Sequence, residues 1–299
     1  MGERGMKRIL GSILLLSVLL LTACGKKEPD ALKVEVYPQA DYWSVLDLSE
    51  TAFSSKEACE ELVERYLVEI ADLLHMEGWW MEANPDAEVL ELNLQIGAME
   101  QSMNFGVVTK SQKDSVTGSI LLSTKIAASG TPDAGLAHEL THMIGFMNEN
   151  SFSLSLTEGM CHYVQAEIGI DPYPAPWSTQ EYIAFMVRAD NANAEAKEKI
   201  AGVASKVGEV NGGYPYGQSV ELNVWYTLSH SFVRYLIDEY GMDTVKELIL
   251  EGVDESSYET YLGKSLEQLR EAWMEYLLTM ECSVTEERLL EYAEELEKQ

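Results

Sequence analysis

The sequence of 299 residues carries 21 basic and 50 acidic side chains, which gives a formal net charge of −29 at pH 7. A surface this acidic repels phosphate backbones and anionic headgroups, so we expect no nucleic acid as a partner. The length is sufficient for one two-lobed domain with a sizeable core, or for two small domains.

The first 24 residues have the pattern of an export signal. Three basic residues precede an apolar run at residues 9–21, which is too short to be a comfortable permanent membrane span. The following LTAC, residues 21–24, resembles the lipobox of bacterial lipoproteins. This resemblance implies cleavage before Cys24 and a lipid anchor on its sulfur, which would hold the domain at the cell membrane, outside the cytoplasm. A plain signal peptide and an uncleaved anchor are the alternatives.

The chain is predicted to comprise four segments: a signal peptide at residues 1–23, a polar tether at 24–32, an N-terminal α/β lobe at 33–150 and a C-terminal helical lobe at 151–299. The signal peptide contains three basic residues and one acidic residue, so its removal would change the formal charge from −29 to about −31. Three cysteines follow Cys24. They are an odd number and include no CxxC pair, so a disulfide framework is not indicated.

The front half of the domain has both strand and helix patterns. We expect strands at residues 33–38, 87–96, 104–110 and 118–125, with the last two joined across a polar turn as a hairpin. Between the first two strands, residues 54–76 have apolar side chains at helical spacing. Either Ser54 or Ser55 is expected to cap this helix.

After residue 130 nearly all of the patterns are helical. Thr131 is expected to cap a helix that has Pro132 at its first position and Asp133 in its first turn. Further helices are expected at residues 154–167, 179–188, 194–207, 220–240, 244–250, 266–278 and 285–297. This order predicts an α+β fold, in which a small mixed β-sheet lobe is followed by a mainly α-helical lobe.

The helix that follows Thr131 contains the sequence HELTH. Residues four apart lie on one face of a helix, so His138 and His142 can present their imidazoles to a single metal ion. Glu139 lies one position round the helix, from where its carboxylate can reach a water molecule beside the ion. The spacing therefore predicts a site for one zinc ion.

A catalytic zinc ion generally takes three protein ligands and keeps a fourth position for water. The best third candidate is Glu158, which lies in LTEGMCHYV at the start of the next predicted helix and is separated from HELTH by 15 intervening residues. Gly159 would allow a neighbouring backbone to approach this helix closely. A first-turn glutamate in isolation is explained by the helix dipole, but the preceding HELTH makes a ligand the better interpretation.

Four other residues invite a functional interpretation. His162 lies one turn after Glu158 on the same helix face, and it is either a partner of the ligands or an ordinary buried histidine. Cys161 is expected to be a small core residue, since free cysteine is among the most buried residue types. His75 and His230 are expected to be structural.

HELTH, followed by a helix with Glu-Gly, resembles the gluzincin metallopeptidases, most closely the aminopeptidase-N-like and peptidase-MA-like branches. Two further segments are similar to that clan: residues 226–241, which begin with a tyrosine, and GAMEQ at residues 97–101. The resemblance covers about residues 97–278. It implies a zincin catalytic domain of the thermolysin-like type.

The resemblance also implies the activity, which is hydrolysis of peptide bonds in peptide or protein substrates. Zinc would be held by His138, His142 and Glu158. Glu139 would act as general base for a water molecule that the metal activates, and Tyr226 would stabilise the oxyanion that develops.

Two features of the clan concern the substrate. If GAMEQ corresponds to the aminopeptidase motif, Glu100 would hold the free α-amine of the substrate. An insertion and Gln101 depart from that motif, so aminopeptidase and endopeptidase activity are both open. For the oxyanion donor, Tyr214 and Tyr216 are the alternatives to Tyr226. The clan places the last strand before the active-site helix along the substrate, so residues 119–123 are expected to be an edge that pairs with a peptide.

Two alternatives to this interpretation come from the same residues. HELTHMIGFMN also matches a metzincin pattern, with Asn148 at the third-ligand position, but a neutral amide is a poor zinc ligand. A non-catalytic surface lipoprotein, either an inactive peptidase fold or a solute-binding protein, is the second alternative. The few strand patterns in the back half argue against the solute-binding protein.

Overall fold

A computed structural model describes residues 32–38, 54–97, 103–104, 108–123, 132–146, 152–170, 177–188, 194–213 and 219–296. The described residues all belong to one compact unit, Leu32–Gln299. The predicted signal peptide, the lipidation site Cys24 and the substrate-binding candidate Glu100 lie outside the described residues. So do Asn148, the two alternative tyrosines at 214 and 216, and the predicted lobe boundary between residues 150 and 151.

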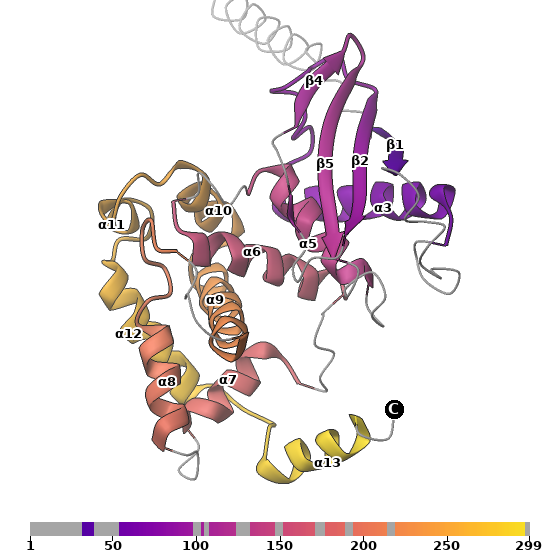
Figure 1. Ribbon diagram of the computed structural model, residues 1–299. Helices are drawn as coiled ribbons and strands as arrows, with labels where there is room; N and C mark the ends of the chain where they lie inside the picture. Colours follow the sequence, from indigo (N-terminus) through magenta and orange to yellow (C-terminus); the bar gives the residue numbers. More distant parts are fainter. Residues whose placement is uncertain are drawn as a thin grey trace, which may run out of the picture. The chain divides into compact units, whose positions relative to one another are not determined.

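A mixed sheet of five strands lies in the described part of the chain, and its strands are β1 (Lys33–Pro38), β2 (Val89–Gly97), β3 (Met103–Asn104), β4 (Thr109–Gln112) and β5 (Ser115–Ser123). β2 lies between β1 and β5 and is parallel to both (Figure 1). Leu90, Leu92 and Leu94 of β2 are buried, as the predicted period-two alternation requires.

The side of β5 that faces away from β2 is occupied by the two short strands. Ile120 and Leu121 of β5 pair with β3, and β4 forms the predicted antiparallel hairpin with the start of β5. The prediction that residues 119–123 form a free peptide-pairing edge is therefore contradicted at Ile120 and Leu121. The physical reason is that β3, which precedes β5 in the chain, folds back and pairs with these two residues.

Ten helices lie in the described residues: α3 (Lys56–Leu74), α5 (Pro132–Ile144), α6 (Leu154–Glu167), α7 (Thr179–Arg188), α8 (Ala194–Ala204), α9 (Ser219–Tyr240), α10 (Met242–Glu251), α11 (Ser256–Leu262), α12 (Leu266–Thr279) and α13 (Glu286–Leu296). All but α11 were predicted. The mixed α and β architecture, with strands preceding most of the helices, is confirmed. Not one of these helices has the length and apolar character needed to cross a membrane.

The helices next to the sheet position the HELTH segment. α3 begins after Ser55, whose hydroxyl accepts a hydrogen bond from the Ala58 amide, as the sequence predicted. α3 and α5 both contact the strands. Gly118 of β5 lies directly under Met143 of α5, where a Cβ atom would press against the methionine sulfur. The sheet therefore supports the helix that carries both candidate histidine ligands.

The helix that carries Glu158 is held between α5 and α9. α6 contacts both of them, and its residues from Leu154 to Cys161 are all buried. A Cβ atom at Gly159 would collide with the backbone carbonyl of Ser229 in α9. The prediction that Gly159 permits a close backbone approach is confirmed. Cys59, Cys161 and Cys282 are free, which agrees with the expected lack of a disulfide framework among them.

Candidate metal centre

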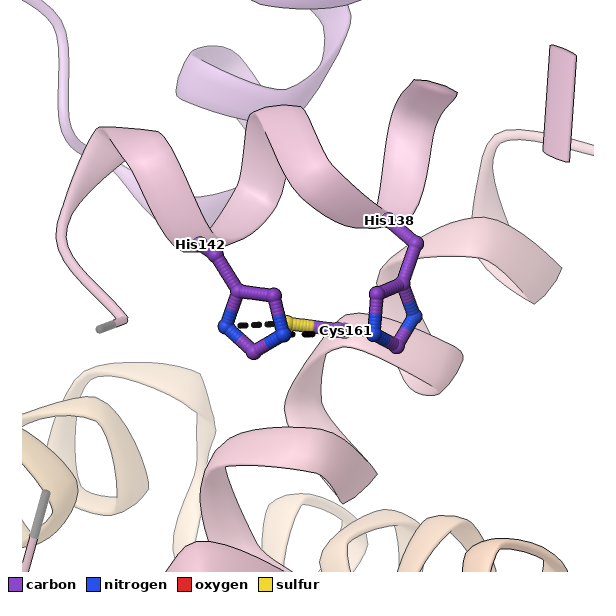
Figure 2. Close-up of side chains that lie close together, drawn as sticks. All are labelled: His138, His142 and Cys161. Atoms are coloured by element: carbon purple, nitrogen blue, oxygen red, sulfur yellow. Dashed lines mark hydrogen bonds between the residues drawn. The ribbon is translucent and has the colours of Figure 1, made fainter. Parts of the chain in front are cut away.

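The two histidines of HELTH lie one turn apart on α5 and present their rings on the same side. Figure 2 shows both imidazoles pointing toward the helix that carries Cys161. Their Nε2 atoms are 3.2 Å apart. His142 is 2% exposed and His138 is 14% exposed, so the pair lies just under the surface and is more open on the His138 side.

Glu158 of α6 brings its carboxylate to the same point. Its Oε2 atom lies 3.1 Å from the Nε2 atom of His138, and its Oε1 atom lies 3.6 Å from the Nε2 atom of His142. The carboxylate is 1% exposed. The structure therefore brings together the three residues that the sequence predicted as metal ligands.

Each imidazole is held on its outer side by a carbonyl oxygen. The Nδ1 atom of His138 is 3.2 Å from the side-chain carbonyl oxygen of Gln165, and the Nδ1 atom of His142 contacts the backbone carbonyl of Phe146. A carbonyl oxygen only accepts hydrogen bonds, so both Nδ1 atoms act as donors. A neutral ring, which is the form that binds a metal, then has its lone pair on Nε2, the atom that faces Glu158, whereas a protonated ring donates from Nε2 to that carboxylate.

Glu158 and the two histidines change each other's electrostatic surroundings. Burial by itself would raise the pKa of Glu158, but the charge of His142 and hydrogen bonds from both histidines outweigh it and hold the pKa of Glu158 well below its usual value. Burial would likewise lower the pKa of His142, but the Glu158 carboxylate raises that pKa overall. Glu158 is therefore ionised and presents a negative charge to the space between the rings.

Cys161, which was expected to be a simple core residue, lies beside the histidines. Its Sγ atom is 3.5 Å from the Nδ1 atom of His142. His138, His142 and Cys161 form a group that could hold a metal ion, with one ligand atom from each residue within 4.8 Å of the others (Figure 2). Burial and the charges of Glu158 and Glu139 raise the pKa of the Cys161 thiol well above its usual value, so the sulfur is protonated.

The two predicted catalytic residues lie on different helices. Glu139 is buried on α5 next to His138, and its charge acts on Cys161. Tyr226 is on α9, and its ring centroid is 5.2 Å from that of His162. His162 in turn lies 5.0 Å from His138, measured between ring centroids, so a row of aromatic rings connects Tyr226 to the candidate ligands.

The remaining histidines are kept neutral or lie at a distance. Burial, followed by the charges of His138 and His230, lowers the pKa of His162 well below its usual value. Burial lowers the pKa of His230 to about 4. His75 is exposed and bonds to Asp243, 3.0 Å away. The structural interpretation of His230 and His75 agrees with these surroundings.

The contact between Gln165 and His138 was not predicted from the sequence. Gln165 has no charge, and it lies two turns beyond Glu158 on the same helix. A polar residue on the otherwise buried face of an amphipathic helix was the available signal.

Comparison of the chain with protein-family models, with curated proteins and with solved structures gave no match. The residues of this centre are therefore the basis for the function proposed below.

Proposed function

We propose that the chain is a zinc metallopeptidase that hydrolyses peptide bonds outside the cytoplasm, anchored to the membrane through Cys24. The convergence of His138, His142 and Glu158 carries the proposal. Two histidine nitrogens, which lose any proton they carry when a metal binds, and one ionised carboxylate are a ligand set known for catalytic zinc, and three protein ligands leave a position open for solvent.

Glu158 fits the third-ligand position better than Cys161 does. The carboxylate faces the Nε2 atoms of both histidines, whereas the sulfur contacts the Nδ1 atom of His142, which also contacts the carbonyl of Phe146. A thiol must also lose its proton to bind a metal, and the surroundings of Cys161 oppose that loss. We therefore assign Glu158 as the ligand and Cys161 as a neighbour.

The other residues complete the proposed reaction. A zinc ion in this position would polarise a peptide carbonyl and acidify a water molecule. The Glu139 carboxylate would accept the water proton and pass it to the leaving amine. The Tyr226 phenol would donate a hydrogen bond to the oxygen on which negative charge develops. The neighbouring rings of His162 and His138 support a location of Tyr226 near that oxygen.

The arrangement of the elements supports a thermolysin-like zincin domain as part of the proposal. HELTH lies on a helix that packs on the sheet, and the third ligand comes from the following helix.

Metal analysis of the purified full-length protein tests the ligand set. We expect about one zinc ion per chain, retained in Cys161→Ala and Glu139→Gln and lost in His142→Ala and Glu158→Gln. In cobalt-substituted protein, a ligand set without sulfur gives no cobalt–thiolate charge-transfer band. Zinc loss in Cys161→Ala, together with that band in the unmodified protein, would transfer the third-ligand role to the cysteine.

Cleavage of a mixed peptide library tests the reaction. The zinc-loaded protein should cleave peptides, a chelator should stop the cleavage, and added zinc should restore it. Glu139→Gln should bind zinc with unchanged stoichiometry and show no cleavage, since it lacks the base. Zinc-loaded protein that cleaves no peptide in the library would favour the non-catalytic lipoprotein instead.

A further inference from the structure

Gln165 joins the first turn of α5 to the candidate ligand His138. Its side-chain amide uses both ends: Nε2 donates a hydrogen bond to the backbone carbonyl of Ala134, 2.7 Å away, and Oε1 lies 3.2 Å from the Nδ1 atom of His138. The side chain is 2% exposed. Little space or solvent is therefore available for another arrangement of the amide.

The chemistry of the two contacts decides which end faces which partner. The Ala134 carbonyl can only accept, so the NH₂ end of the amide must face it. The carbonyl end then faces His138, and that oxygen can only accept as well. His138 must therefore donate from Nδ1, which turns its Nε2 atom toward Glu158.

We infer that Gln165 is a positioning residue, which fixes the rotation of the His138 ring so that Nε2 is the metal-binding nitrogen. This inference rests on the proposed zinc site. Partners of this kind commonly hold the ring of a ligand histidine and change metal affinity by about 10–100-fold when they are removed. Because Ala134 and His138 lie on the same helix, Gln165 also fixes α6, and with it Glu158, against the helix that provides the other two ligands.

His142 provides an internal control for the effect of Gln165. Its ring is held by the backbone carbonyl of Phe146, which no side-chain substitution at position 165 removes. A change at Gln165 should therefore remove the partner of the His138 Nδ1 proton and leave the partner of the His142 Nδ1 proton in place. A general loss of stability would affect both rings.

The test compares Gln165→Met, which keeps the length of the side chain but has only a weak thioether acceptor, with Gln165→Glu, which keeps a strong oxygen acceptor. Both are made in the full-length protein. Zinc affinity is measured by competition with a chelator, and the Nδ1 protons of both ring systems are observed by NMR in the zinc-loaded protein. We expect Gln165→Met to bind zinc about 10–100-fold more weakly and to lose exchange protection of the His138 proton alone. Gln165→Glu should recover most of the affinity.

Two results would overturn the inference. The first is a Gln165→Met protein with unchanged zinc affinity and a protected His138 proton. The second is equal loss of protection at both histidines, which would indicate a general structural role. Failure of the proposed peptidase is distinguishable, since a protein that binds zinc but cleaves no peptide still reports on Gln165, whereas an unmodified protein that binds no zinc would overturn both.

Discussion

Replacement of Gly159 by alanine sets two opposing effects against each other. In the interior of a helix, alanine is favoured over glycine by about 1 kcal/mol. Against this gain, the added Cβ atom would collide with the carbonyl of Ser229 and approach Val233 to within 2.7 Å. Overpacking of this kind costs about 1–3 kcal/mol and occasionally more. The cost should lie at the upper end, because the Ser229 atoms are backbone and can move only if α9 moves.

We therefore expect Gly159→Ala to lower the free energy of unfolding by about 1–2 kcal/mol. The matched control is Gly202→Ala in α8, where a Cβ atom would meet nothing within 4 Å. That substitution should stabilise the protein by at most about 1 kcal/mol. Urea denaturation of the metal-free proteins, followed by circular dichroism, measures both changes. A Gly159→Ala protein at least as stable as Gly202→Ala would refute the close contact between α6 and α9.

Three further predictions concern stability. Hydrogen bonds from Ser283 and then from Ser178 lower the pKa of Glu181 to about 2, below its usual value of 4.5. The ionised Glu181 carboxylate therefore stabilises the folded protein above about pH 4.5, and this stabilisation is lost as the pH falls toward 2. Glu181→Gln should accordingly melt at a lower temperature than the unmodified protein at pH 7 and at a similar temperature near pH 2. Asn84 is fully buried and its side chain donates to three backbone carbonyls. Asn84→Ala should therefore lower the free energy of unfolding, measured by urea denaturation, by about 1–3 kcal/mol. Zinc at 100 times its Kd should raise the free energy of unfolding by about 2.7 kcal/mol, and His142→Ala should abolish that increase.

The sequence predicted those elements whose signals are local. The periodicity of α6 and α7 reproduced both ends of each helix, because apolar spacing and termini are encoded in neighbouring residues. α11 was missed, since its seven residues bury only Ser257, Tyr258 and Leu262, too few to establish a period. The pairing on the outer side of β5 was predicted wrongly, because strand neighbours are chosen by contacts that are distant in sequence.

The candidate centre was also predicted only as far as local sequence signals allow. HELTH identified His138 and His142, because helical spacing fixes the relative positions of residues on one helix. Glu158, on the following helix, was identified because a catalytic zinc ion generally takes a third protein ligand. The contacts of Gln165 and Cys161 with the histidines were not predicted. They depend on the rotation of α6 against α5, which no spacing within either helix specifies.

The close contact between Gly159 and Ser229 lies near both the candidate ligand Glu158 and the proposed oxyanion donor Tyr226. Glu158 immediately precedes Gly159 on α6, and Tyr226 lies three residues before Ser229 on α9, which places it about one turn away. The distance between the two helix backbones therefore influences both the position of the candidate ligand and the approach of Tyr226 to His162. A side chain at position 159 that separated the helices would move the proposed oxyanion donor away from the metal centre. Peptide cleavage by a zinc-loaded Gly159→Ala protein should accordingly decrease by more than its zinc occupancy does.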